Sequence, residues 1–337
     1  MTNTHSSGKA RRWHNTLGSK FRWFVNGIRR RGALVLPTLH RRSMLGQLML
    51  SARSSSSVVG DAPAVVCLTS YGGRIKHVHY TILTIANGTT RPKRIILWIS
   101  ESDANRVTPS LRSLQRRGLE IKLTEDYGSH KKYYPYSVSV SESSTAKFPL
   151  VTADDDVLYP ASWLSELINA ANTEPLPVIV AHRAHRIKLE PGGIAPYLSW
   201  NLECATTEPS YANVATGVGG VLYPAEFAAQ VGKTWSTEFM QAAPTADDLW
   251  LHSRSVLLQV PTKQVNHVSA RVVEHHPGIP SLSDLNVIRG SNDETISRIY
   301  SPEIISIVRR AVNAGPEFLG QRPCRDAAPD PTSPSGI

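Results

Sequence analysis

Three consecutive carboxylates, Asp154, Asp155 and Asp156, are the residues of this chain whose type and spacing point most directly to chemistry. They follow the apolar run 148–151 and precede the apolar pair 157–158, a pattern that predicts a buried strand ending in an acidic cluster. Adjacent carboxylates repel one another unless a cation lies between them. Mg²⁺ or Mn²⁺ held by one or two carboxylates keeps open positions for phosphate oxygens. The cluster therefore predicts a divalent metal site that a phosphate-bearing ligand can reach.

The orientation of the three acids follows from the strand period. If the alternation of a strand continues to its end, Asp154 and Asp156 point to one side and Asp155 to the other. The simpler alternative is an acidic loop that caps a helix over 161–171. A cap needs only one acid, and three adjacent acids are electrostatically costly, so the pattern favours the metal site.

A second acidic pair, Asp247 and Asp248, opens a predicted helix in the segment 243–251. Thr245 as N-cap with Asp248 three residues later is nearly a capping box, and both acids suit the helix dipole. Because capping requires one acid, a catalytic carboxylate is an equally good interpretation of the pair. His275 and His276 form a further candidate metal-binding pair, although a histidine in a partly exposed turn more often has no ligand role.

Strand and helix patterns alternate from residue 62 onward. Strands are predicted at 64–69, 94–99, 121–123 and before Asp154, with helices at 77–86 and from 108 to about 118, where Pro109 suits the first helical position. This alternation predicts an α/β fold with a mostly parallel central sheet flanked by helices. In such sheets ligands bind at the carboxyl ends of the strands. Tyr71, Asp126 and the acidic cluster are therefore expected along one edge.

The second half of the chain is less regular. Strands are predicted at 177–181 and near 255–260, and closing helices within 291–312. The segment 215–223 puts Gly217, Gly219 and Gly220 beside an apolar strand, where glycine lets a backbone or a ligand come close. A tight turn explains the same glycines equally well.

The net charge of +10 is unevenly distributed over the 337 residues. Residues 1–60 contain eleven Lys or Arg and no acid, so the remaining 26 basic and 27 acidic residues nearly balance. Basic residues interleaved with aromatics and leucines suit an anionic membrane surface. A disordered tail, nucleic-acid contact and an organelle transit peptide are the alternatives. We expect a basic arm at 1–60, one catalytic domain at 61–314 and a disordered Pro-rich tail at 315–337.

The three cysteines, Cys67, Cys204 and Cys324, are widely spaced and form neither a metal signature nor a disulfide framework, which indicates a reducing compartment. No run approaches the roughly 18–20 apolar residues that cross a bilayer. These features predict a cytoplasmic protein, and the basic arm suits a peripheral position on the inner face of the cell membrane.

Taken with these motifs, residues 64 to about 312 resemble bacterial glycosyltransferases of the GT-A fold, particularly the surface or capsular polysaccharide type. The segments that carry the resemblance are LTSYGGR at 68–74, EDYGSHKKYYP at 125–135, TADDDVLYP at 152–160, TGVGGVLYP at 216–224 and PTADDLWL at 244–251. The DXD motif of the family falls on 154–156, and its acidic motif at a helix start falls on Asp247 and Asp248. The family often has Glu where this chain has Asp247.

The resemblance implies a hexosyltransferase that moves a sugar from a nucleotide-diphosphate donor to a hydroxyl of a saccharide or lipid-linked saccharide, with Mn²⁺ or Mg²⁺ as cofactor. Asp248 or Asp247 would be the general base. The implied metal ligands are Asp154, Asp156, His275 and His276; the implied donor contacts are Thr69, Tyr71, Arg74, Asp126, Lys131, Asp154 and Asp155; the implied acceptor-side residues are Gly219 and Gly220.

Three other functions share part of this pattern. A phosphatase or phosphotransferase of the haloacid-dehalogenase type also has Asp-x-Asp at a strand end, but its motif comes early and has Thr or Val where this chain has Leu158. A sugar-nucleotide pyrophosphorylase has a Gly-rich basic loop after the first strand, and only Gly72, Gly73 and Arg74 resemble one here. A nucleic-acid-binding protein could use the arm, but the body has no basic stripe.

Overall fold

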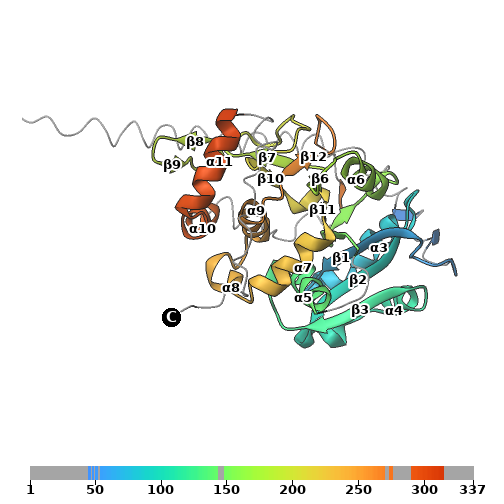
Figure 1. Ribbon diagram of the computed structural model, residues 1–337. Helices are drawn as coiled ribbons and strands as arrows, with labels where there is room; N and C mark the ends of the chain where they lie inside the picture. The colour runs from blue at the N-terminus through green and yellow to red at the C-terminus, as the bar shows by residue number, and fades with distance from the viewer. Residues whose placement is uncertain are drawn as a thin grey trace, which may run out of the picture.

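A computed structural model describes residues 54–142, 148–269, 273–275 and 290–314, together with 45, 46, 48, 50 and 51 (Figure 1). The expected tail, most of the basic arm and His276 lie outside the described residues, so those expectations stay predictions. In the part that is described, Val58 is fully buried and the Gly60 amide donates to Pro92 O at 2.9 Å. The folded body thus includes residues before the expected boundary at 61.

A seven-stranded sheet with the order β12-β6-β11-β4-β1-β2-β3 forms the centre of the molecule. The strands are β1 (Ala62–Thr69), β2 (Pro92–Ser100), β3 (Leu119–Thr124), β4 (Leu150–Ala153), β6 (Ile179–Ala181), β11 (Val221–Tyr223) and β12 (Thr262–Gln264). Neighbouring strands are parallel except at β11, which is antiparallel to β4 and to β6. The predicted mostly parallel sheet with flanking helices is confirmed.

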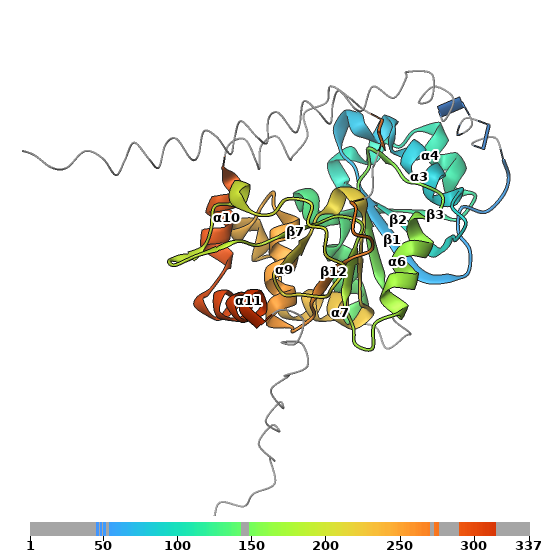
Figure 2. The ribbon, with the colours of Figure 1, turned by 90° about the horizontal axis from the view of Figure 1, so that it is seen from above.

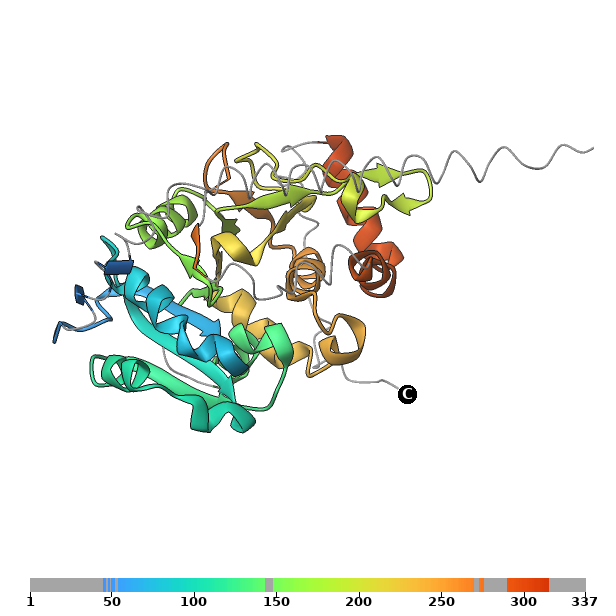
Figure 3. The same ribbon diagram turned by 180° about the vertical axis from the view of Figure 1, so that it is seen from behind.

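Side chains of β1 alternate between two hydrophobic cores, as expected of a strand covered on both faces. Val66 and Leu68 pack with helices α3 (Val78–Ala86), α4 (Pro109–Gln115) and α6 (Trp163–Asn172). Val65 and Cys67 pack in the core that includes α5 (Tyr134–Ser141), α7 (Ala225–Thr234) and α9 (Asp247–Leu257). Figures 1 and 3 show these two helical layers from opposite sides. The buried thiol of Cys67 is a core residue, as its apolar strand predicts.

The C-terminal helices pack around α9. They are α8 (Phe239–Ala242), α10 (Ser291–Ile299) and α11 (Pro302–Ala314), and they lie on the side of the molecule opposite α3 and α4 (Figure 2). Short antiparallel pairs complete the body: β7 (Ala184–Arg186) with β10 (Asn213–Ala215), β8 (Leu189–Glu190) with β9 (Gly193–Ile194), and β5 (Val157–Leu158) with β13 (Val273–Glu274). In the ranges described, no helix combines the length and apolar character that spanning a bilayer requires.

Three local predictions are corrected by the structure. The strand expected at 255–260 is wrong, because 255–257 form the last turn of α9, whose apolar face buries Val256, and the strand follows as β12. Thr245 does not cap α9, which begins at Asp247 after Ala246 with no side-chain cap. Helices α5 and α7 were not predicted. Helix α5 is rich in Tyr, Ser and Val and has almost no helical periodicity. Helix α7 does bury apolar residues at helical spacing, among them Phe227, Ala228 and Val231, so its signal was overlooked.

Candidate functional site

The carboxyl ends of four parallel strands open into one cavity of about 810 Å³, within the size range of ligand sites. The segments that follow β1, β2, β3 and β4 line the cavity together with the start of α9. Their lining side chains include Tyr71, Arg74, Asp103, Asp126, Asp154, Asp155, Asp156, Asp247 and Asp248. The predicted meeting of the Tyr71 loop, Asp126 and the acidic cluster at one sheet edge is thus observed. Segments that are distant in sequence share this space.

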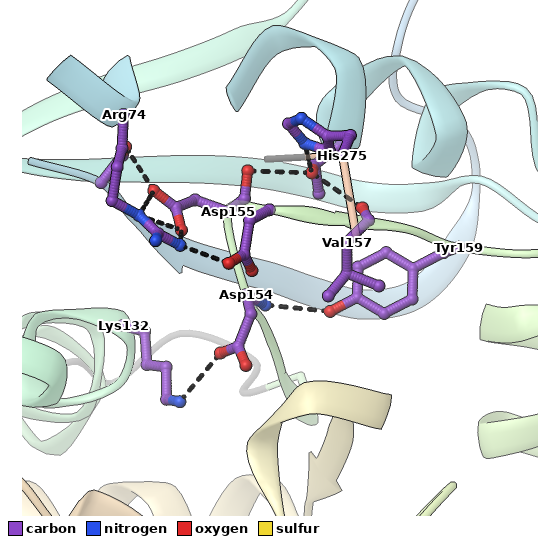
Figure 4. A network of polar contacts seen from close by, with 10 residues as sticks. Arg74, Lys132, Asp154, Asp155, Val157, Tyr159 and His275 are labelled. Atoms are coloured by element: carbon purple, nitrogen blue, oxygen red, sulfur yellow. Dashed lines mark hydrogen bonds and ion pairs between the residues drawn. The ribbon is translucent and has the colours of Figure 1, made fainter. Parts of the chain in front are cut away.

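The acidic cluster forms a turn between β4 and β5 and does not continue the strand. Asp155 is buried and accepts from Ser70 Oγ at 2.5 Å and from Arg74, and Arg74 Nη2 also lies 2.7 Å from Asp156 Oδ2 (Figure 4). Asp154 points instead toward Lys132. The predicted strand alternation, with Asp155 pointing away from Asp154 and Asp156, is not observed, because the chain leaves the strand conformation after Ala153 and all three acids line the cavity.

The negative charges around Asp156 are not fully balanced by Arg74. Burial, followed by the charge of Asp155, raises the pKa of Asp156 to about 6 although Arg74 opposes the shift. A carboxylate in this position is stabilised by an additional cation.

The composition of the whole cavity indicates the same need for a cation. Seven Asp side chains line it against four basic ones, Arg74, Lys131, Lys132 and Arg183. In the portion of the chain described, no three His, Cys, Asp or Glu side chains form a metal cluster. Mg²⁺ at nucleotide sites, however, usually has one or two carboxylates, with water and phosphate oxygens completing its shell. Asp154 and Asp156 fit a cation of this kind.

His275 lies outside the cavity lining. It is buried behind the acidic turn, where its amide donates to Asp156 O at 2.9 Å and its Nε2 lies 3.1 Å from Thr81 Oγ1. The Thr81 hydroxyl donates to Val157 O, so it accepts from Nε2–H. Figure 4 shows the ring of His275 on the side of Asp155 away from Lys132. This placement supports a role in holding the turn and does not support the expected metal-ligand role.

Lys132, at the end of the 3₁₀ helix η3 (Gly128–Lys132), connects the two acidic segments. Its Nζ lies 3.1 Å from Asp154 Oδ1 and 2.8 Å from Asp247 Oδ2. Burial disfavours the ammonium, but Asp154, Asp247 and Asp248 raise its pKa well above the ordinary value. A buried, charged lysine therefore ties the end of β4 to the start of α9.

Asp247 and Asp248 are adjacent but differ in environment. Burial opposes ionisation of Asp247, yet Lys132 and then His130 keep its pKa below the ordinary value. Burial, followed by the charge of Asp247, raises the pKa of Asp248 to about 7, and its Oδ2 accepts from the Gly217 amide at 3.0 Å. Two carboxylates whose pKa values are driven apart are suited to different roles, one as a fixed anion and one as a proton acceptor.

The remaining expected donor contacts surround the cavity mouth. Tyr71 is 46% exposed, and the Arg74 guanidinium lies 5.7 Å from its ring centroid. Asp126 pairs with Lys131, which lowers the pKa of that carboxyl. Thr69 lines the cavity while its hydroxyl donates to Trp98 O at 2.9 Å. All of these side chains reach the cavity, and the exposed Tyr71 ring is free to stack on a planar group.

The glycines of 217–220 have different neighbours from those expected. Gly219 and Gly220 pack against His182 and Trp163, and neither lines the cavity. Gly220 also has φ +87°, which favours glycine. Their placement does not support an acceptor-side role. Gly217, in contrast, lines the cavity beside Lys132 and Asp248.

Sequence reasoning missed Asp103 and a wall of the cavity formed by the second half of the chain. That wall includes Arg183, His185, Tyr197 and Asn292, with Arg183 Nε donating to Thr216 Oγ1 at 2.6 Å. These residues come from separate short elements and connecting segments with no shared motif. Only Asp103, which accepts from the Gly72 amide at 3.1 Å, carries a local signal, since it follows a predicted strand end.

Comparison with solved structures finds distant similarities, of which three are described. A mannosyltransferase from Pyrobaculum calidifontis in complex with GDP-Man and Mn²⁺ is 12% identical, with a TM-score of 0.44 over 81% of this chain and 85% of that one. A 4-diphosphocytidyl-2C-methyl-D-erythritol synthase from Anaerococcus prevotii is 11% identical, with a TM-score of 0.39 over 72% and 98%. TarS (1–349) from S. aureus is 10% identical, with a TM-score of 0.39 over 62% and 58%.

No protein-family model matches the chain, and no curated protein is significantly similar to it. Since the TM-scores of all three structures lie below 0.5, we assign no activity to this chain from them.

Proposed function

We propose that this protein is a glycosyltransferase that moves a sugar from a nucleotide-diphosphate donor to a hydroxyl of a saccharide or lipid-linked saccharide acceptor. The observation that carries the proposal is the meeting of two acidic segments, 154–156 and 247–248, in one cavity at the carboxyl edge of the sheet. One segment is suited to a phosphate-bound cation and the other to a proton acceptor. Transfer of a sugar to a hydroxyl can use both.

Asp154 and Asp156 would hold Mn²⁺ or Mg²⁺, which when bound neutralises the charge of the departing diphosphate. Tyr71 at the cavity mouth would stack on the nucleobase, with Arg74 and Asp126 near it. In the reaction, the acceptor oxygen forms a bond to the anomeric carbon as the bond from that carbon to the diphosphate oxygen breaks. The acceptor proton passes to Asp248, whose pKa of about 7 suits a general base.

Assembly of a cell-surface polysaccharide is the process we propose for this reaction, on the basis of the sequence resemblance. The basic residues of 1–60 suit an anionic membrane surface, where lipid-linked acceptors are found. We therefore propose a cytoplasmic protein that is peripheral at the inner face of the membrane.

The test is release of nucleoside diphosphate by the full-length chain from UDP-, GDP- and dTDP-sugars, with Mn²⁺, with Mg²⁺ and with EDTA. We expect at least one donor to be consumed in a metal-dependent way, and Asp156→Ala to lose about 100-fold or more of the rate while it stays folded. Full activity of Asp156→Ala in EDTA would contradict the metal role. Release of pyrophosphate from a sugar phosphate and a nucleoside triphosphate would identify a nucleotidyltransferase instead.

A further inference from the structure

Lys132 lies between the two acidic segments of the cavity, 154–156 and 247–248. Its side chain is 8% exposed, and its Nζ contacts one carboxylate from each segment, Asp154 and Asp247. An ammonium has three donors, and two of them are directed at these acids. The lysine is therefore committed to protein carboxylates and is poorly placed to bind a phosphate itself.

Gly217 is a second, independent observation that places Lys132 beside the start of α9. A Cβ at Gly217 would lie 2.7 Å from Lys132 Nζ and 3.3 Å from Asp248 Oδ1. The Gly217 amide meanwhile donates to Asp248 Oδ2 at 3.0 Å. The absence of a side chain at this position gives room to the ammonium and to the carboxylate together, so both are held against one stretch of backbone.

The two acids at the start of α9 thus have different partners. Asp247 is 6% exposed and is engaged by the lysine, whereas Asp248 is partly exposed to the cavity and is held by a neutral amide. The charged and titratable groups around Asp248 come from five further positions in the fold: Asp247 on α9, Lys132 on η3, Asp154 after β4, Tyr223 on β11 and Tyr197 on the 3₁₀ helix η4 (Tyr197–Ser199). Lys132 is the one cation in this set.

We propose that Lys132 is a positioning residue that holds Asp247 and Asp154 as fixed partners and thereby leaves Asp248 as the carboxylate that accepts the acceptor proton. The role of Asp248 rests on the proposed function, whereas the two ion pairs rest on geometry alone. This inference distinguishes two adjacent acids that are equivalent in the sequence.

The ion pairs are tested without any activity by a double-mutant cycle on urea unfolding of the full-length chain. Lys132→Met leaves the buried Asp247 and the partly exposed Asp154 without their cation, and Asp247→Asn removes the buried acid. We expect the double variant to be more stable than the two single effects predict, by about tenfold or more in the unfolding equilibrium constant. Should Lys132→Met fail to fold, recovery of folding by the double variant shows the same coupling. Additive effects overturn the proposal.

The matched control is the neighbouring pair formed by Lys131 and Asp126. The Lys131 side chain is 3% exposed, but the Asp126 side chain is 67% exposed, so solvent screens the carboxylate of that pair. The cycle with Lys131→Met and Asp126→Asn is expected to show coupling below about threefold. Equal coupling in the two cycles would mean that burial of the Lys132 pair has no special effect, and would count against the proposal.

The choice of base is tested by kinetics with whichever nucleotide sugar the wild-type chain consumes. Asp248→Asn should lose about 1000-fold or more in kcat with little change in donor KM, and Asp247→Asn about tenfold. Lys132→Met should lose kcat strongly, and adding Asp247→Asn should restore part of it. A larger loss for Asp247→Asn than for Asp248→Asn overturns the assignment. If the wild type consumes no nucleotide sugar, the proposed function fails, and the unfolding cycle alone decides whether the ion pairs stand.

Discussion

Arg74 and Asp155 form an ion pair with more than one donor beneath the acidic turn. Arg74 Nε lies 3.1 Å from both carboxylate oxygens of Asp155, and Nη2 contacts the same carboxylate. Because Nη2 also lies 2.7 Å from Asp156 Oδ2, one guanidinium orients two consecutive acids. The loop after β1 therefore determines how the turn after β4 faces the cavity.

Arg74→Lys should destabilise the protein by about 2–4 kcal/mol, since an ammonium cannot reproduce the planar fork and Asp155 would stay buried. Urea unfolding measures the change. The matched control is Arg94→Lys, because Arg94 contacts Glu120 through Nε at 2.6 Å and Nη2 at 2.8 Å, but that pair is about one-third exposed. The control should lose less than about 1 kcal/mol. Similar losses in the two variants would refute a special role for the buried pair.

The proposed general base predicts a particular pH dependence. With the pKa of Asp248 raised to about 7 by burial and by Asp247, kcat/KM should rise with pH through about 7. Below that value only the deprotonated fraction reacts, so the rate should fall about tenfold for each pH unit. Rates of nucleoside diphosphate release between pH 5 and 9 provide the profile. A flat profile below pH 7 would exclude Asp248 as the titrating base.

The same carboxyl predicts an effect of pH on stability. Its pKa rises from 3.8 to about 7 on folding, so the native state binds the extra proton and this group's contribution to stability is lost as pH rises through about 7. Asp248→Asn should therefore stabilise the protein relative to wild type at pH 8, by roughly 1–3 kcal/mol, and much less at pH 4. Thermal or urea unfolding at both pH values measures the difference.

The control for this effect is Asp126→Asn. The pKa of Asp126 is lowered by Lys131, so its contribution to stability is present above the unfolded pKa and is lost as pH falls. Removing that charge should have the opposite sign at pH 8, and a small size because the side chain is exposed. A loss of stability in Asp248→Asn at pH 8 would show that its hydrogen bond to Gly217 outweighs the cost of the buried charge.

The first half of the sheet could be predicted because its strands are continuous apolar runs. Each of β1, β2 and β4 is largely buried, so the strand pattern is strong, and its alternation with helices predicts parallel strands. The acids after β4 and at the start of α9 were found for the same reason, since each is a charged cluster at the boundary of a regular element. Local patterns suffice for such features.

The contacts that complete the site depend on long-range packing. Lys131 and Lys132 are adjacent and identical in type, yet one pairs with exposed Asp126 and the other with buried Asp247. Both lysine side chains are buried, and the acid that each one meets depends on where η3 packs beneath the sheet edge. The reversed direction of β11 likewise places Gly217 in the cavity and Gly220 against Trp163. A periodicity within one segment does not contain this information.

Gly217→Ala should separate catalysis from stability. The added Cβ would lie 2.7 Å from Lys132 Nζ and 3.3 Å from Asp248 Oδ1, so these groups must move apart by several tenths of an ångström or more. The ammonium is the end of a flexible side chain, and we expect a loss of stability below about 2 kcal/mol. Displacement of the proposed base should nevertheless lower the rate about 10- to 100-fold.

Two other glycines provide the comparison for Gly217→Ala. Gly220→Ala would put a Cβ 2.5 Å from the Trp163 ring at φ +87°, so its loss of stability should be the larger. Gly73→Ala meets no atom within 4 Å and should leave stability nearly unchanged. Measurement of unfolding and of nucleoside diphosphate release for the three variants tests the order. If Gly217→Ala keeps the full rate, the close approach of Lys132 and Asp248 to Gly217 is not needed for the reaction, because the site then functions with both groups displaced.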